Sequence, residues 1–113
     1  MRFKLQSIAI NNTNTPSTTV IIPAYNEEKR INGLLKELTD FISVNQIEWN
    51  IIVSIDGSDH TEDIVKEFSS KYPFVSYVKN GERSGKGGAI KRVIQRATGE
   101  LIILMDADGS VKF

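Results

Sequence analysis

Two aspartates near the end of the chain are the residues whose type and spacing point most directly to chemistry. Asp106 and Asp108 follow the five apolar residues Leu101–Met105. This run is short and has Gly99 and Gly109 on its two sides, which predicts a strand buried on both faces, as in a parallel sheet. Because side chains alternate along a strand, an extended backbone would place both carboxylates on one side. Such a pair could hold Mg²⁺ or Mn²⁺, which in turn binds phosphate oxygens; the alternative is a polar turn that closes a strand.

Polar residues also follow three earlier apolar segments. The first, Thr18–Ile22, is β-branched throughout and predicts a strand that ends at Pro23. The second and third predicted strands are Trp49–Ile55 and Phe74–Val78. The polar residues that follow the four strands are, in chain order, Tyr25 and Asn26, then Asp56, Gly57 and Ser58, then Asn80 and Lys86, and last Asp106 and Asp108. In open α/β sheets ligands bind outside the carboxyl ends of the strands, so four such turns indicate one shared binding site.

Helices are expected between these strands. Asn26 is a candidate N-cap, and the helix after it ends near Asn45. The apolar residues that define the three helix faces are Ile31, Leu34, Leu35, Leu38, Phe41 and Ile42, then Ile64, Val65, Phe68 and Tyr72, and last Ala89, Ile90, Val93, Ile94 and Ala97. This alternation predicts a three-layer α/β fold, with a mostly parallel sheet of about four strands and helices on both faces.

Composition bounds the class of protein. A chain of 113 residues with 40% apolar and 25% charged residues is expected to form one domain. Its formal net charge is zero, which gives no electrostatic argument for a nucleic-acid partner. The absence of cysteine excludes disulfides and zinc–thiolate sites and fits a reducing compartment. No apolar run approaches a membrane span or a signal peptide, so we expect a cytoplasmic chain without a membrane segment. Residues 1–17 are predicted to be a flexible lead-in and residues 18–113 to form the domain.

Two motif interpretations explain only part of the pattern. Gly81–Gly87 follows a strand and opens a helix, as a phosphate-binding P-loop does. Its glycines have three residues between them where a P-loop has four, and Gly87 stands where the metal-binding hydroxyl belongs. Asp106–Val111 alone resembles the signature of haloacid-dehalogenase phosphohydrolases, in which the first aspartate is a nucleophile. In that family the motif opens the domain, whereas here it lies at the end of the chain.

A third interpretation explains all four turns together. The segments that carry it are Val20–Glu28, Asp56–Thr61, Gly85–Ala89 and Asp106–Gly109. In these segments residues 18 to 111 resemble the N-terminal, nucleotide-sugar-binding part of a family 2 glycosyltransferase of the GT-A fold. The glycine-rich segment together with the Asp-x-Asp motif is most similar to the branch that makes dolichyl- or polyprenyl-phosphate sugars.

The resemblance implies a role for each matching residue. The nucleotide of a UDP- or GDP-sugar would be bound by Pro23, Ala24, Tyr25, Glu27, Asp56, Lys86 and Asp106. Asp56 would accept a hydrogen bond from the base, and Lys86 would approach the diphosphate or the ribose. Asp106 and Asp108 would hold Mg²⁺ or Mn²⁺, which neutralises the diphosphate leaving group. The implied reaction is inverting sugar transfer to an acceptor such as a polyprenyl phosphate.

The same resemblance leaves a second class of function open. In this family the general base and the acceptor site lie after the Asp-x-Asp strand, so we expect them beyond Phe113. The chain by itself would then bind a nucleotide without efficient transfer, or act as a non-catalytic nucleotide-binding or assembly module. An unpaired sheet edge would also favour self-association into a homo-oligomer.

Overall fold

The fold is taken from a computed structural model of the chain, which describes residues 17–80, 93–94, 101–107 and 111–112. Predictions for the glycine-rich segment, for Lys86 and for Asp108 lie outside these residues. In the described part no helix has the length and apolar character needed to cross a membrane.

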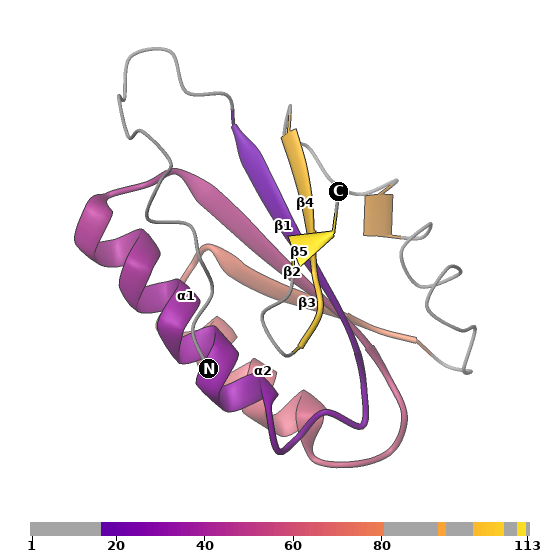
Figure 1. Cartoon of the computed structure of the whole chain (residues 1–113). Coiled ribbons are helices and arrows are strands. Elements are labelled where there is room, and N and C mark those ends of the chain that lie inside the picture. The colour runs from indigo at the N-terminus through magenta and orange to yellow at the C-terminus, as the bar shows by residue number, and fades with distance from the viewer. Residues whose placement is uncertain (1–16, 81–92, 95–100, 108–110, 113) are drawn as a thin grey trace.

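The described elements form one five-stranded sheet with two long helices (Figure 1). In chain order they are β1 (Thr18–Tyr25), α1 (Ile31–Asn45), β2 (Trp49–Asp56), α2 (Thr61–Lys71), β3 (Val75–Lys79), β4 (Leu101–Met105) and β5 (Val111–Lys112). The sheet order is β3-β2-β1-β4-β5, with the first four strands parallel and β5 antiparallel to β4. The predicted α/β class and the four parallel strands are therefore confirmed.

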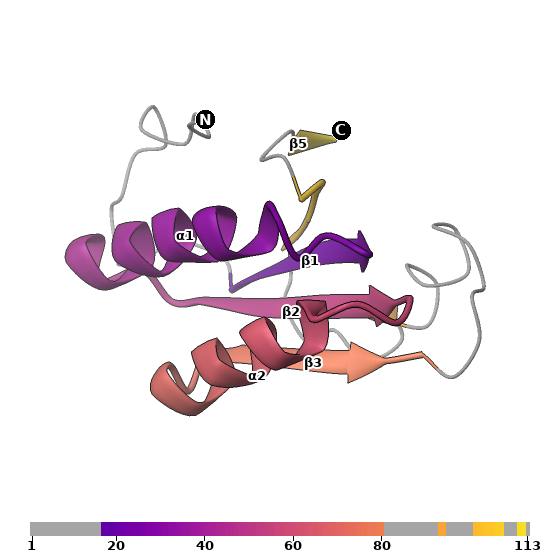
Figure 2. The same cartoon turned by 90° about the horizontal axis from the view of Figure 1, so that it is seen from below.

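Both helices pack on one face of the sheet. Alternate residues of the two central strands form a single buried cluster with the apolar stripes of α1 and α2. Its fully buried members include Val20, Ile22, Ile51, Val53, Leu35, Leu38 and Val65. Figure 2 shows α1 and α2 running next to each other along the strands. The predicted helix faces are confirmed, because every predicted residue of α1 and α2 is buried or packs against this cluster.

The opposite face of the sheet is covered too, at least around its centre. Ile21 of β1 points to the side away from α1 and α2, and it is fully buried. The third predicted helix lies mostly outside the described residues, of which Val93 and Ile94 are helical. Val93 is buried as predicted, whereas Ile94 is 44% exposed, so its predicted inward orientation is wrong. A helix layer on this second face stays a prediction.

Pro23 does not end the first strand, contrary to the sequence prediction. β1 continues through Pro23 to Tyr25, in parallel register with β2 up to the pair Tyr25 and Asp56. The pairing of β1 with β4 already ends at Ile21. On that side of β1 no described strand needs the N–H that Pro23 lacks, so the proline is tolerated at this position.

The burial of β4 was predicted only in part. Its bounds match the prediction, but Leu101 and Ile102 are 48% and 37% exposed, and only Met105 is fully buried. The reason lies in its neighbours, because β5 pairs with Leu104 and Met105 alone. Among the described residues the first half of β4 therefore has a strand on one side only. Self-association through this edge stays a prediction.

Candidate functional site

The polar residues that follow the strands collect at one end of the sheet. Tyr25 and Asp56 are register partners at the carboxyl ends of β1 and β2. Because side chains alternate, both lie on the face opposite α1 and α2. Continuing the register of β1 and β4 by two residues brings Asp106 to the level of Pro23, on the same face. Four residues predicted to bind a nucleotide, Pro23, Tyr25, Asp56 and Asp106, thus share one end and one face of the sheet.

Asp56 is the most unusual of these residues. Its side chain is only 5% exposed although it is a carboxylate, and its Oδ1 atom is buried without a hydrogen-bond partner in the described part of the chain. A buried polar atom without a partner destabilises a fold by about 1–3 kcal/mol, so such atoms are uncommon and are found where a ligand completes the bonding. Asp56 Oδ1 is therefore a candidate acceptor for a donor from outside the described residues.

The other predicted residues of β1 differ in what they can offer a ligand. The Tyr25 ring is 45% exposed beside Asp56 and is accessible to a ligand. Pro23 is half-buried, and Ala24 is almost fully buried. The side chain of Ala24 belongs to the core cluster under α1 and α2, so Ala24 can contact a nucleotide only through its backbone.

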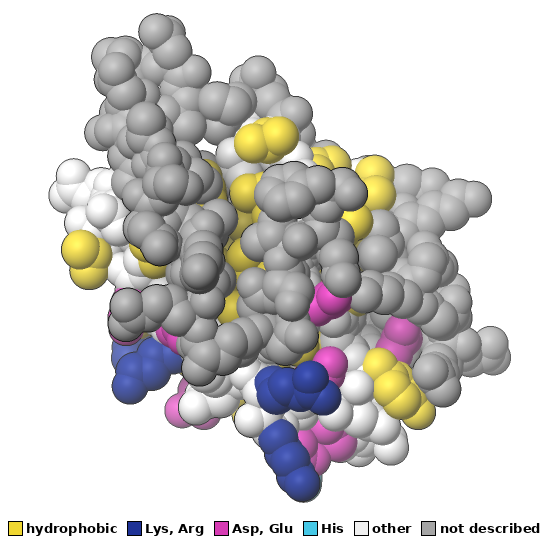
Figure 3. Space-filling model, in the orientation of Figure 1, with side chains coloured by type: hydrophobic (Ala, Val, Ile, Leu, Met, Phe, Trp, Pro, Cys, Tyr) yellow, Lys and Arg dark blue, Asp and Glu magenta, His cyan; other side chains and the backbone are white. Residues whose placement is uncertain are grey.

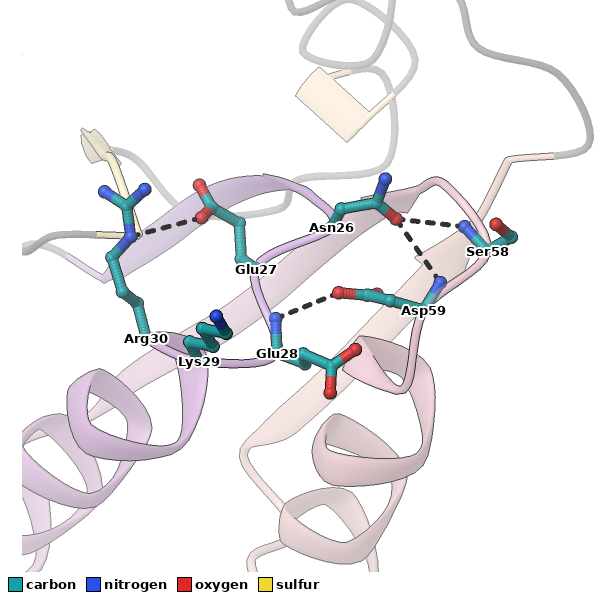
Figure 4. Close-up of a pocket in the computed structure, with 7 residues that line it drawn as sticks. All are labelled: Asn26, Glu27, Glu28, Lys29, Arg30, Ser58 and Asp59. Atoms are coloured by element: carbon teal, nitrogen blue, oxygen red, sulfur yellow. Dashed lines mark hydrogen bonds and ion pairs between the residues drawn. The ribbon is translucent and has the colours of Figure 1, made fainter.

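The loops that follow β1 and β2 are hydrogen-bonded to each other (Figure 4). Oδ1 of Asn26 accepts the backbone N–H groups of Ser58 and Asp59, at 3.1 and 3.3 Å. In the opposite direction, Glu28 N–H donates to Asp59 Oδ2 at 3.1 Å, and Glu27 N–H donates to Thr61 Oγ1 at 3.0 Å. The two loops therefore form one bonded unit.

These bonds correct the prediction that Asn26 caps α1. The helix begins at Ile31, after a turn in which Glu27 C=O accepts the N–H groups of Arg30 and Ile31 at 2.9 Å each. Asn26 instead adopts a left-handed backbone with φ of 50°, which asparagine tolerates, and its side chain points to the neighbouring loop. Sequence reasoning missed this role because its partners lie more than 30 residues away.

A pocket of about 440 Å³ lies beside this pair of loops. Its lining residues are Asn26, Glu27, Glu28, Lys29, Arg30, Ser58 and Asp59 (Figure 4). Figure 3 shows charged side chains gathered at this lower end of the molecule. The Glu27 carboxylate is paired with Arg30, at 3.4 Å between Oε1 and Nε. Neither Asp56 nor Asp106 lines this pocket, so it borders the predicted nucleotide site and does not coincide with it.

Two ionisable groups in the second loop have shifted pKa values. Partial burial raises the pKa of Asp59, but hydrogen bonds from Thr61 and Glu28 outweigh that effect and hold it below the usual value. The hydrogen bond to Asp63 and the charge of Glu28 raise the pKa of His60. His60 is exposed and directly precedes α2.

The third and fourth strands bring fewer described residues to the site. Lys79, which sequence reasoning did not single out, donates from Nζ to Gly57 C=O at 2.6 Å. Asn80 is buried and donates to Ser54 Oγ at 3.2 Å. Asp106 is half-buried, while its predicted partner Asp108 and the predicted phosphate contact Lys86 lie outside the described residues. In the described part no three potential ligand side chains converge on a metal position.

The family model of glycosyl transferase family 2 matches residues 19–113 of the chain. The chain belongs to glycosyl transferase family 2. The match includes both the glycine-rich segment and Asp106–Gly109, so it favours the glycosyltransferase interpretation over the P-loop and the phosphohydrolase.

Curated relatives give a finer comparison. A dolichyl-phosphate beta-glucosyltransferase of Trichomonas vaginalis is 39% identical over 101 residues, which are 84% of this chain and 30% of the relative. The dolichyl-phosphate beta-glucosyltransferase of Homo sapiens is 36% identical over 110 residues, 88% of this chain and 33% of the relative. The chain thus spans about a third of the length of the curated relatives it matches.

Solved structures share the fold. The mannosyltransferase PcManGT from Pyrobaculum calidifontis, in complex with GDP-Man and Mn²⁺, superposes with a TM-score of 0.73 at 29% identity. The superposition covers 90% of this chain and 30% of that one. S. aureus TarS gives a TM-score of 0.70 at 30% identity, over 81% of this chain and 16% of TarS. The fold is therefore shared with part of these GT-A glycosyltransferases.

Proposed function

We propose that the chain carries the donor-nucleotide site of an inverting glycosyltransferase that uses a UDP- or GDP-sugar. The observation that carries the proposal is Asp56, a buried carboxylate at the carboxyl end of β2 whose Oδ1 atom lacks a hydrogen bond. A base N–H would supply the missing donor and remove the penalty of the unpaired acceptor. The half-exposed ring of Tyr25 beside it offers an apolar surface to the base.

The proposal assigns the diphosphate to the end of β4. Asp106 and Asp108 would hold Mg²⁺ or Mn²⁺, and the bound metal neutralises the charge of the diphosphate leaving group. The donor set fits, because Mg²⁺ is held in such sites by one or two carboxylates together with substrate phosphates. The half-buried Asp106 lies on the same face of the sheet as Asp56, which is consistent with one nucleotide reaching both. The Mn²⁺ in the related mannosyltransferase structure supports the use of a divalent metal.

The acceptor is proposed from the relatives. Both the Trichomonas and the human proteins are named dolichyl-phosphate beta-glucosyltransferases, which favours a polyprenyl phosphate as the acceptor of the complete enzyme. The general base that deprotonates or positions such an acceptor is not assigned to a described residue.

Calorimetric titration of UDP and of GDP, with and without Mn²⁺, tests the donor site. We expect one nucleotide to bind in a metal-dependent manner, and we expect binding to be lost in an Asp106→Ala/Asp108→Ala double variant. The substitution Asp40→Ala on the outer face of α1 is the matched control for loss of an exposed carboxylate. A folded chain that binds neither nucleotide would contradict the proposal.

A further inference from the structure

Asn26 joins the two candidate ligand residues through the loops that follow them. It directly follows Tyr25, and its side-chain oxygen holds the two peptide N–H groups of the turn that directly follows Asp56 and Gly57. The return bonds from Glu27 and Glu28 join the same two loops. Among the described side chains, Asn26 is the one that connects the ends of β1 and β2 through two bonds from a single atom.

The backbone of both loops is adapted to this contact. Asn26 has φ of 50° and Gly57 has φ of 99°, both in the left-handed region. A Cβ atom added to Gly57 would overlap Oδ1 of Asn26 and would lie 2.9 Å from its Cγ. Gly57 is therefore required by the Asn26 carboxamide as well as by its own backbone conformation.

Asp56 depends on this arrangement for its direction. Its buried Oδ1 has no hydrogen bond within the described chain, so no bond to this oxygen helps to fix the carboxylate. Its position is then set by β2, whose pairing with β1 ends at Asp56, and by the turn that begins at Gly57. The backbone pairing with β1 holds β2 in place, whereas the turn has to be held by side-chain contacts. Lys79 supports it from the other side, through the bond from its Nζ to Gly57 C=O.

We infer that Asn26 is a positioning residue of the nucleotide site, which aims Asp56 and Tyr25 at the base by fixing the turn after β2. The inference rests on the proposed function and adds to it a residue that need not touch the nucleotide. Its predicted effect is on nucleotide affinity, with the fold retained.

Three substitutions separate the hydrogen bonds from the backbone conformation. Asn26→Asp keeps both an acceptor oxygen and tolerance for positive φ, Asn26→Gly keeps only the tolerance, and Asn26→Ala keeps neither. Asn45→Ala is the matched control, because Asn45 also makes a hydrogen bond through its carboxamide, whose Nδ2 donates to Phe41 C=O at 2.8 Å at the far end of α1. This substitution also removes one asparagine side chain and its hydrogen bond, but it leaves the two loops unchanged.

The experiment measures UDP and GDP dissociation constants in the presence of Mn²⁺ for the four variants, each first shown to unfold cooperatively. We expect affinity to fall at least tenfold in Asn26→Ala and Asn26→Gly, and to stay within about threefold in Asn26→Asp and Asn45→Ala. Faster amide hydrogen exchange at Ser58 and Asp59 in the first two variants reports the freed turn even where stability also changes.

The outcomes distinguish this inference from the proposed function. Nucleotide binding by the unsubstituted chain that is equally strong in Asn26→Ala or Asn26→Gly overturns the inference alone. An equal loss of affinity in Asn45→Ala also overturns it, since the effect would then follow stability. The absence of nucleotide binding in the unsubstituted chain overturns the proposed function, and the positioning role with it.

Discussion

β2 ends at an aspartate and β4 ends just before one, yet the two strands are buried to different extents. β2 has β1 and β3 on its two sides and α1 and α2 over one face, and most of its residues are buried. Among the described residues, β4 has β1 on one side and only the two residues of β5 on the other, and Leu101 and Ile102 are exposed. An apolar run thus becomes a buried strand only where neighbours cover it. The same contrast makes Asp56 a buried acceptor and leaves Asp106 half-buried.

We expect the largest difference in stability when one apolar side chain of β2 and one of β4 are each shortened to alanine. Ile51 of β2 is fully buried and Leu101 of β4 is 48% exposed, and both lie on the face that carries the helices. We expect Ile51→Ala to lower the free energy of unfolding by about 2–5 kcal/mol, because it leaves a cavity. Leu101→Ala is expected to lower it by less than about 1 kcal/mol. Urea denaturation of the two variants measures both values, and equal losses would show that β2 and β4 do not differ in how much their packing contributes to stability.

The turn after β2 gives a prediction of intermediate size. Gly57→Ala places a Cβ against the Asn26 carboxamide and at a strained φ, so we expect it to destabilise the fold by about 1–3 kcal/mol. Gly33 of α1 is the matched control, because a Cβ there meets no atom within 4 Å and alanine favours a helix. We expect Gly33→Ala to raise the midpoint of thermal unfolding, with a gain of about 0.5–1 kcal/mol. A neutral Gly57→Ala would show that the two loops are not packed together.

The smallest expected effect is a pH dependence in the same loop. Hydrogen bonds from Thr61 and Glu28 hold the pKa of Asp59 below its usual value of 3.8. The ionised group therefore stabilises the fold at pH values above 3.8, and this contribution is lost as pH falls through the lower pKa of the folded state. We expect the difference in unfolding free energy between the unsubstituted chain and Asp59→Asn to shrink as pH falls from 5 toward 3. A difference that is constant over this range would contradict the assigned hydrogen bonds.

Local patterns were sufficient to predict most of the fold. The apolar spacing of α1 and α2 predicted their buried faces, because that spacing is a property of each helix alone. The four parallel strands and their polar carboxyl ends followed from the alternation of patterns along the chain. The polar residues at these carboxyl ends include Asp56 and Tyr25, which are register partners in the structure.

The errors arose where a residue depends on distant partners. Proline by itself predicts a strand end at Pro23, but β1 continues to Tyr25 while its pairing with β4 stops at Ile21. The local sequence predicts that Asn26 caps a helix, but its partners are Ser58 and Asp59 in another loop. The exposure of Leu101 depends on how far β5 extends along β4, which no local pattern of apolar residues encodes.

The central claim is that a nucleotide binds at the carboxyl ends of the strands, against Asp56. The most direct test is a nuclear magnetic resonance titration of the chain with UDP or GDP and Mg²⁺, followed through the backbone amides. We expect the amides of Tyr25, Asp56 and Asp106 to shift together and saturably, while those at the opposite end of the sheet around Val44 and Trp49 do not. We also expect these shifts to vanish in Asp56→Asn, which keeps the shape of the side chain and replaces an acceptor oxygen by an N–H donor. Shifts that centre elsewhere, or that persist in Asp56→Asn, would contradict the claim.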